Sequence, residues 1–324
     1  MKTALAPYVR ILGRGPSFSR SLTREEAEAA MGIVLAGDAA PEALGAMLML
    51  MRMKGETADE IAGFATAARA AAPVSGALSG EVALDWPSYA AGRTRGLPWF
   101  LLAAKLVASA GHPVLLHGWN SHQGSNASVR AALGPLGIPV AQDRDVRELA
   151  TGIAYLPLET LSMPLFDILG LRAVFNLRSC INTVLRVLNP AGAAASVQGV
   201  FHPPYRQLQQ DACLAMGQKN LTVLKGGGGE FERNPSKDIA LFGLRNGVAF
   251  DEVAAPMDAA HVRLADGAQS SDPAALPALW SGELEDAFAL SIVLGTADLA
   301  LQTLGVTTPA SELWQARDRS AIAA

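Results

Sequence analysis

The sequence predicts an α/β protein in which a small N-terminal helical domain precedes a larger α/β domain with a central mixed, mainly parallel sheet. Helix signals alone fill roughly the first 70 residues, and short apolar strands then alternate with helices of roughly 10–15 residues. The chain has 324 residues, 50% of them hydrophobic, which is enough for a large core. We expect the domains at residues 1–75 and 76–324, with helices within 160–188 joining the first domain in space.

Three helices are predicted in the N-terminal domain. Thr23 and Glu26 have the spacing of a capping box, so a helix should begin there. Pro41 opens a second helix, and a second capping box of Thr57 and Glu60 opens a third. The small residues at 73–80 then read as a linker.

Short buried strands follow the linker, and helical segments separate most of them. The strands are expected at 82–85, 114–117, 138–141, 196–200 and 221–224. The helices are expected at 99–110, 127–133, 206–216 and 284–304. This alternation is the pattern of a parallel sheet covered by helices.

Composition excludes several classes of protein. A net charge of −4 with 50% hydrophobic residues is unlike a disordered chain. No apolar stretch is long and uncharged enough for a membrane span, and the N-terminal apolar run is too short for a secretory signal, so we expect no membrane partner. Cys180 and Cys213 have neither disulfide nor metal spacing, which indicates reduced thiols and a cytoplasmic protein.

The positive charge is concentrated in two segments. Residues 1–24 and residues 172–237 each carry a net +5, although the whole chain is acidic. Clustered Lys and Arg focus a positive potential, so these segments indicate an anion site. The alternative is that the charges are spread over solvated faces.

Ligands of open α/β sheets bind outside the carboxyl ends of the strands, so the predicted strand exits carry the candidate site. Arg93 and Arg95 flank Thr94 after the first strand, in a setting suited to phosphate. Arg178, Asn182 and Arg186 share one helical face by their spacing. His117 and His122 have no third ligand nearby, so a zinc site is not expected.

Four consecutive glycines, 226–229, follow the strand at 221–224. Such a run allows backbone N–H groups to approach a ligand or allows positive φ angles, and the alternative is a surface hairpin. Glu230 and Glu232 could hold a hard cation such as Mg²⁺, or pair with Lys225 and Arg233.

Several segments together resemble one known family over nearly the whole chain. They are Leu22-Thr-Arg-Glu-Glu-Ala, residues 45–57, Leu116-His-Gly-Trp-Asn, Leu169-Gly-Leu-Arg-Ala-Val-Phe-Asn, Asn189-Pro-Ala-Gly and Gln198-Gly-Val. The sequence resembles anthranilate phosphoribosyltransferases, whose glycosyltransferase family 3 fold is shared with pyrimidine nucleoside phosphorylases. That resemblance implies a fold of the nucleoside phosphorylase and phosphoribosyltransferase type.

The sequence also departs from the family pattern. After Asp85 the sequence reads Trp-Pro-Ser-Tyr-Ala-Ala-Gly-Arg-Thr-Arg. At this place the family has the Gly-Thr-Gly-Gly-Asp loop that binds phosphoribosyl pyrophosphate. Leu116 replaces a lysine, Trp119 is an extra residue, and Phe166 stands where the family has the arginine that holds anthranilate. Glu-Phe-Glu replaces the Asp-Glu pair that binds Mg²⁺. We therefore do not expect the anthranilate reaction.

These replacements resemble a divergent, nucleic-acid-binding branch of the family. The resemblance implies a homodimer formed through the N-terminal helices, with a positively charged groove that binds DNA and tolerates single strands. The expected groove residues are Arg14, Arg20, Arg186, Arg233 and Lys237.

The alternative hypothesis is a Mg²⁺-dependent glycosyl or phosphoribosyl transferase that acts on an acceptor other than anthranilate. Its ligand would be phosphoribosyl pyrophosphate, and Mg²⁺ would be its cofactor at Glu230 and Glu232. No residue stands out as catalytic. The expected phosphate and ligand contacts, for either hypothesis, are Arg93, Arg95, His117, Gly118, Asn120, Ser121, Arg178, Lys225 and Gly227.

Overall fold

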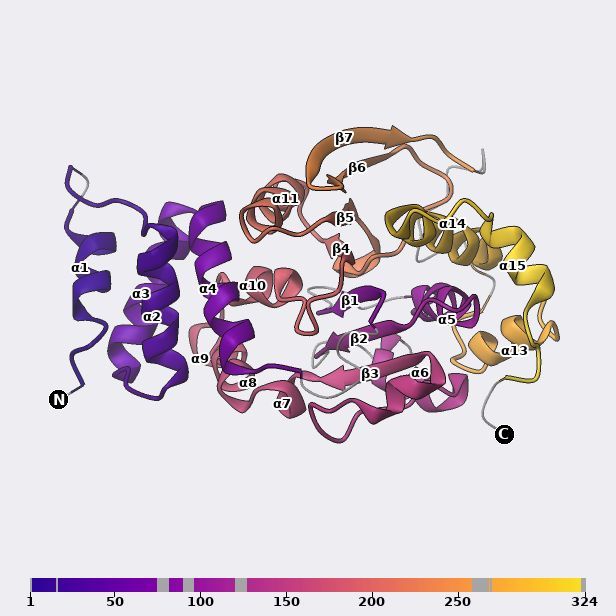
Figure 1. Ribbon diagram of the computed structural model, residues 1–324, viewed down its shortest axis with the longest axis horizontal. Coiled ribbons are helices and arrows are strands. Elements are labelled where there is room, and N and C mark those ends of the chain that lie inside the picture. Colours follow the sequence, from indigo (N-terminus) through magenta and orange to yellow (C-terminus); the bar gives the residue numbers. More distant parts are fainter. Residues whose placement is uncertain are drawn as a thin grey trace.

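The computed structural model describes residues 2–321, apart from 16, 75–81, 90–95, 120–126, 258–267 and 269. Four helices form a unit at one end of the molecule, and a sheet with helices on both faces forms the rest (Figure 1). The helices of this N-terminal unit are α1 (Ala6–Gly13), α2 (Arg24–Leu35), α3 (Pro41–Lys54) and α4 (Ala58–Ala71). The predicted fold class is confirmed, while the exact domain boundaries stay a prediction.

Both predicted capping boxes are formed. The Thr23 side chain accepts a hydrogen bond from the backbone of Glu26, whose carboxylate accepts one from Thr23 N. Thr57 and Glu60 repeat this arrangement at the start of α4. Glu60 is buried and its second oxygen also accepts a hydrogen bond from Leu22 N at 2.9 Å. One carboxylate therefore caps α4 and fixes the chain entering α2.

Seven strands form one sheet in the order β3-β2-β1-β4-β5-β6-β7. The first five strands in this order pair in parallel with their neighbours. Strand β6 pairs antiparallel with both β5 and β7. The strands are β1 (Leu84–Ser88), β2 (Val114–Gly118), β3 (Ile153–Pro157), β4 (Ala195–Val200), β5 (Asn220–Lys225), β6 (Ile239–Arg245) and β7 (Val248–Ala254). Strands β1 to β4 are buried along their whole length, as expected for parallel strands covered on both faces.

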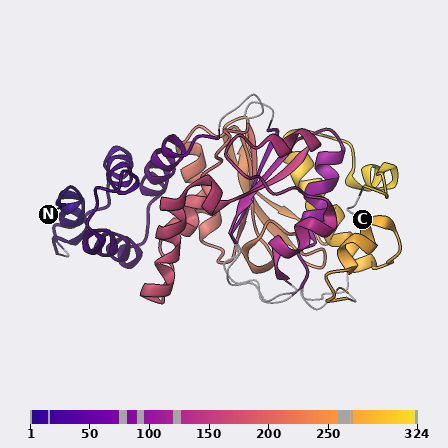
Figure 2. The ribbon, with the colours of Figure 1, turned by 90° about the horizontal axis from the view of Figure 1, so that it is seen from below.

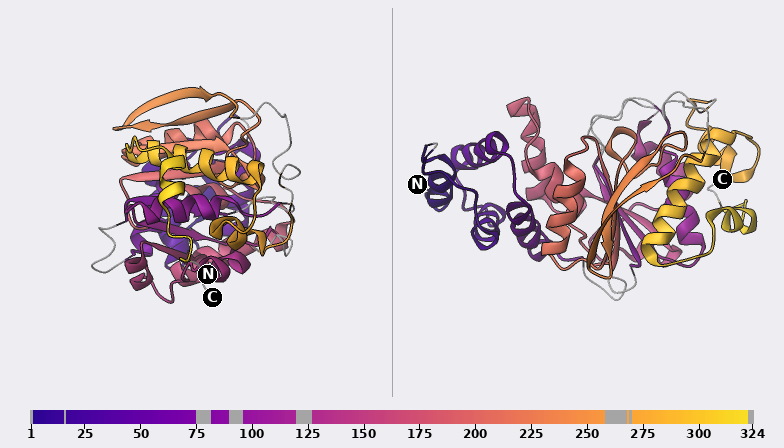
Figure 3. Two further views of the ribbon diagram at one scale, coloured as in Figure 1. Left: turned by 90° about the vertical axis from the view of Figure 1, so that its right-hand side faces the viewer. Right: turned by 90° about the horizontal axis from the view of Figure 1, so that it is seen from above.

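Two apolar cores lie on opposite faces of the sheet. One contains α10 and α11 and continues into α2, α3 and α4, and the other contains α5 and α14 around Trp86, Trp99 and Phe100. The N-terminal unit and the C-terminal helices therefore lie on opposite sides of the sheet (Figures 2 and 3). The remaining helices are α5 (Phe100–Ser109), α6 (Val129–Leu133), α7 (Leu158–Leu161), α8 (Met163–Gly170), α9 (Arg172–Phe175), α10 (Ile181–Val187), α11 (Tyr205–Ala215), α13 (Ala275–Ser281), α14 (Ala287–Leu304) and α15 (Ala310–Ala316).

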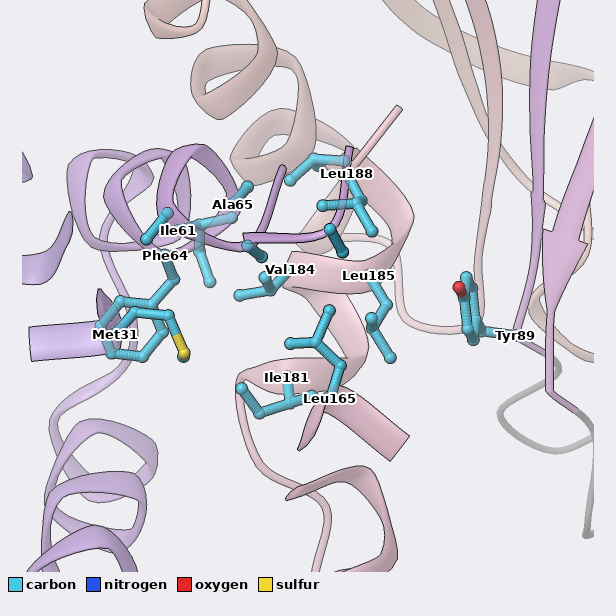
Figure 4. Close-up of a cluster of buried hydrophobic side chains, with 14 of the residues drawn as sticks. Met31, Ile61, Phe64, Ala65, Tyr89, Leu165, Ile181, Val184, Leu185 and Leu188 are labelled. Carbon is cyan, nitrogen blue, oxygen red and sulfur yellow. The ribbon is translucent and has the colours of Figure 1, made fainter. Parts of the chain in front are cut away.

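The apolar face of α10 attaches the N-terminal unit to the α/β part. Ile181, Val184 and Leu185 belong to the same apolar cluster as Phe64 of α4 and Leu165 of α8 (Figure 4). All five side chains are fully buried, so each contributes roughly 1.5–3 kcal/mol of apolar burial. The opposite, polar face of α10 is thereby held at the exit of the sheet.

Pairing between β1 and β4 stops early. It is limited to Leu84↔Ala195 and Asp85↔Ser196, whereas β1 pairs with β2 through Ser88. Pro87 has no N–H group to donate to a ladder. The carboxyl ends of β1 and β4 therefore separate at the point where the strand order reverses.

One helix in the described part of the chain, α14, is long and apolar enough to cross a membrane by length and composition alone. More than half of it is buried inside the molecule, against α5 and the sheet. Such a helix is typical of the core of an α/β protein, so the finding is weak support for a membrane span.

We expect Glu60→Ala to lower the free energy of unfolding by about 2–3 kcal/mol, because two backbone N–H groups lose a buried acceptor. Glu26→Ala is the matched control, since its capping box lies at the surface and should cost less than about 1 kcal/mol. Urea denaturation followed by circular dichroism measures both. Equal losses in the two variants would contradict the role assigned to Glu60.

Candidate functional site

A pocket of about 420 Å³ lies at the carboxyl end of β4, between the α/β part and the end of α3. This is the point where the strand order reverses, the usual ligand position in open α/β sheets. Its walls are Arg52, Arg172, Asn176, Arg178, Ser179, Asn182, Thr183, Arg186, Val200, Phe201, His202, Tyr205 and Gln209. We call it the arginine pocket.

Among the residues that the structure describes, four arginines and no carboxylate line this pocket. Arg178, Asn182 and Arg186 are all on its wall. The predicted common helical face is wrong for Arg178, which lies in the segment before α10, whereas Asn182 and Arg186 belong to that helix. Arg52 comes from the end of α3, and its guanidinium donates a hydrogen bond to the backbone oxygen of Arg178 at 2.6 Å. The pocket therefore combines charges from segments more than 100 residues apart in the sequence.

The electrostatics of the pocket favour an anion. Burial lowers the pKa of the Arg178 guanidinium, and the charges of Arg172 and Arg52 lower it further. An arginine nevertheless stays protonated in a protein. Glu56 lies near the pocket, where burial raises the pKa of its carboxyl and the charge of Arg52 partly offsets this. A bound anion would relieve the repulsion between the guanidinium groups.

Arg186 is the most buried of the four arginines that line the pocket, with 5% of its surface exposed. Its guanidinium donates to Tyr89 O at 2.5 Å and to Asn182 O at 3.0 Å. Burial lowers its pKa, and the nearby Glu230 carboxylate offsets part of that shift. Arg186 thus connects the end of β1, helix α10 and the loop after β5.

His117 lies in the interior and does not line the arginine pocket. Its Nδ1 is 2.9 Å from the Tyr89 hydroxyl, and its Nε2 is 3.1 Å from Asp85 Oδ1. Ser196 continues this buried row by donating to the other oxygen of Asp85 at 2.7 Å. In this geometry the imidazole positions Tyr89, whose backbone oxygen accepts from Arg186.

The loop of four glycines folds back onto β4. A Cβ atom on Gly199 would lie 2.1 Å from the carbonyl carbon of Glu230, and one on Gly226 would lie 1.9 Å from its oxygen. Gly229 has φ +95° and lies against Phe201 N and the Arg186 guanidinium. Close backbone approach therefore accounts for glycine at these three positions.

The two glutamates of this loop are fully buried. Glu232 Oε2 accepts a hydrogen bond from Phe100 N, the first residue of α5, at 3.0 Å. It thus caps α5 and ties the loop to the face of the sheet opposite the N-terminal unit. Among the residues that the structure describes, no group of three or more His, Cys, Asp or Glu could hold a metal ion.

The five predicted groove residues are not brought together. Arg14 is the C-cap residue of α1 and Arg20 lies between α1 and α2, so both belong to the N-terminal unit, whose α1 is far from the sheet (Figure 1). Arg233 is buried beside α14, where its guanidinium donates to Ala255 O at 2.6 Å. Lys237 is exposed just before β6, so only Arg186 of this set lines the arginine pocket.

The other predicted ligand contacts are also dispersed. Gly118 ends β2, Lys225 is exposed at the end of β5, and Gly227 belongs to the glycine loop. None of these three lines the arginine pocket. Arg93, Arg95, Asn120 and Ser121 lie outside the described residues, so their roles stay predictions.

Sequence reasoning missed several pocket residues. Arg52 follows an apolar run on α3, and its only local signal was a charge at the end of that run. Arg172 lies inside the segment 169–176 that carries the family resemblance, and Phe201, His202 and Tyr205 directly follow β4. Their positions just past a buried strand could have indicated a ligand site.

Two of the departures from the family pattern contact each other. The rings of Trp119 and Phe166 pack edge to face, with centroids 5.7 Å apart. The residue expected to be an insertion after β2 therefore packs against the phenylalanine expected in place of an arginine. Trp86 and Tyr89 are core residues with at most 2% of their surface exposed, so neither ring is open to stack on a base.

Comparisons with known proteins agree on one family. Residues 6–72 match the glycosyl transferase family helical bundle domain. An anthranilate phosphoribosyltransferase of Rhizobium rhizogenes is 33% identical over 325 residues, covering 90% of this chain and 92% of that protein. One of Solibacter usitatus is 34% identical, covering 73% of this chain and 71% of that protein.

Solved structures show the same fold. The anthranilate phosphoribosyltransferase of Thermus thermophilus superposes with a TM-score of 0.76 at 23% identity, covering 99% of this chain and 94% of that one. The Saccharomyces cerevisiae enzyme, in complex with PRPP and Mg, gives 0.72 at 15% identity, covering 97% and 92%.

We expect Glu232→Ala to lower the free energy of unfolding by about 1–3 kcal/mol, because the buried N–H of Phe100 loses its acceptor. Glu232→Gln keeps a carbonyl oxygen in place and should cost clearly less. Urea denaturation of both variants provides the comparison. An alanine variant as stable as the unmodified protein would argue against the capping role.

Proposed function

Because the chain belongs to the anthranilate phosphoribosyltransferase family, we propose that it is a phosphoribosyl or related glycosyl transferase whose acceptor is not anthranilate. Its phosphorylated donor binds in the arginine pocket. Two buried cysteines without a disulfide are consistent with action in the cytoplasm.

The observation that carries this proposal is the convergence of four arginines on one pocket at the reversal of strand order. Guanidinium groups bind phosphate through paired hydrogen bonds. A pocket of about 420 Å³ is in the size range of small-molecule sites. Arginines that enclose a pocket favour a small phosphorylated ligand over a long polyanion.

The polar residues around the arginines suit a sugar phosphate. Arg172 and Arg178 are partly exposed and face no carboxylate on the pocket wall, so they are the proposed phosphate contacts. Gln209 lies on α11 with its Oε1 buried, and no described residue donates a hydrogen bond to it. Together with the Tyr205 hydroxyl, it offers hydrogen-bond partners for ribose hydroxyls.

The aromatic pair Trp119–Phe166 supports an acceptor other than anthranilate. An aromatic ring stands where the resemblance implies a guanidinium for the anthranilate carboxylate. Loss of such a charged partner costs on the order of 2–5 kcal/mol in binding. The acceptor of this protein therefore carries no carboxylate at that position.

Nucleic-acid binding by a homodimer is the second candidate function, and a patch on α1 favours it. Arg10, Arg14 and Arg20 surround a shallow hollow together with Phe18, which is 73% exposed. An exposed ring beside arginines is suited to stacking on a base. Against it, Arg20 already pairs with Glu26 at 2.6 Å.

Isothermal titration calorimetry with phosphoribosyl pyrophosphate tests the first function. We expect saturable binding that Arg172→Ala weakens roughly 10- to 100-fold, as for a lost hydrogen bond between charged groups. Arg147→Ala is the matched control, because that side chain is 83% exposed and lies outside the pocket. No binding by the unmodified protein would remove this function.

Fluorescence anisotropy with a labelled single-stranded oligonucleotide tests the second function. Groove binding predicts affinity that falls steeply with salt, with a slope of about −0.7 per phosphate contact. Arg14→Ala and the double variant Arg93→Ala/Arg95→Ala should reduce both affinity and slope. Absence of binding at low salt would exclude this candidate, and a monomer in light scattering would exclude the dimer.

A further inference from the structure

Relatives with this fold include an enzyme whose structure holds PRPP together with Mg. A divalent cation of this kind is bound by one or two carboxylates together with the phosphates of the ligand. The carboxyl edge of the sheet is where such carboxylates would have to lie in this chain. Few acidic residues occur there.

The sequence leaves three carboxylates close to the ends of the parallel strands. The segments 89–99, 119–128 and 201–204, which follow β1, β2 and β4, contain neither Asp nor Glu. Glu159 follows β3, and Glu230 and Glu232 belong to the glycine loop after β5.

Each of these three carboxylates already has a neighbour in the protein. Glu159 pairs with Arg130 at 2.6 Å. Glu232 caps α5 through Phe100 N at 3.0 Å. Glu230 is fully buried, and neither it nor Glu232 lines the arginine pocket. The two residues that would replace the metal-binding pair therefore do not form a Mg²⁺ site in this pocket.

Arginine side chains supply the positive charge of the arginine pocket. A phosphate group carries about −1.5 to −2 charges at pH 7, so four guanidinium groups match two phosphate groups. They come from α3, from the segment around α9 and from α10. None of the described residues on the pocket wall is a carboxylate, although Glu230 lies near Arg186 and Glu56 near Arg52 behind the wall. Burial of Arg178 and Arg186 strengthens their attraction to an anion.

We propose that the arginine pocket binds a ligand with two linked phosphate groups through Arg52, Arg172, Arg178 and Arg186, without a divalent metal ion. This inference rests on the proposed function and deepens it, because it identifies what neutralises the diphosphate. Arg186 forms the buried floor of the site, and Arg52, Arg172 and Arg178 are its more exposed contacts.

The test is a calorimetric titration of the full-length protein with inorganic pyrophosphate and with phosphoribosyl pyrophosphate, in EDTA and in excess Mg²⁺. We expect binding in EDTA, and weaker binding in Mg²⁺ because the cation competes with arginine for the anion. Arg178→Ala should weaken binding in EDTA roughly 10- to 100-fold. Arg147→Ala, which removes one positive charge elsewhere, should change it less than about threefold.

The outcomes separate this inference from the proposed function. Binding of either anion that requires Mg²⁺ would overturn metal-free recognition and leave the proposed transferase function in place. No binding under both conditions would overturn both. Glu230→Gln and Glu232→Gln provide a second measurement, since a metal site would lose its Mg²⁺ response in these variants. We expect the two variants to bind pyrophosphate in EDTA at least as tightly as the unmodified protein.

Discussion

The structure around the candidate site depends on one buried guanidinium. Arg186 donates to Tyr89 O at the end of β1 and to Asn182 O within α10, and it lies against Gly229 of the loop after β5. A buried charge is costly unless hydrogen bonds satisfy it. These contacts meet that requirement, and they fix three segments around the point where the strand order reverses.

In the proposed function, arginine side chains take the role that glycine backbone and a metal ion can have in a phosphate site. Its glycine loop packs against β4 and α5, with Glu232 as a helix cap. The loop therefore has a structural role, which accounts for the close approach at Gly199 and Gly226. A fold can keep its ligand position while exchanging the groups that neutralise the ligand, because function depends on the site more than on the fold.

A row of buried polar side chains lies behind the candidate site. Ser196, Asp85, His117 and Tyr89 form a buried polar row across β4, β1 and β2. Pro87 ends the pairing of β1 with β4 and so separates the strand ends beside it. The packing of α10 on α4 and α8 (Figure 4) fixes the position of this helix. Arg186 of α10, and Arg178 just before the helix, lie on the wall of the arginine pocket.

The sequence alone determined the fold class and both capping boxes. It also grouped Arg178, Asn182 and Arg186, although Arg178 lies in the segment before α10 and not on its helical face. These depend on residues near one another in the chain, where spacing and helix chemistry decide the outcome. Only the tertiary structure brought Arg52 and Arg172 to the same pocket, buried His117 between Asp85 and Tyr89, and assigned Glu232 to α5. Those contacts join segments that are distant in sequence, so long-range packing had to decide them.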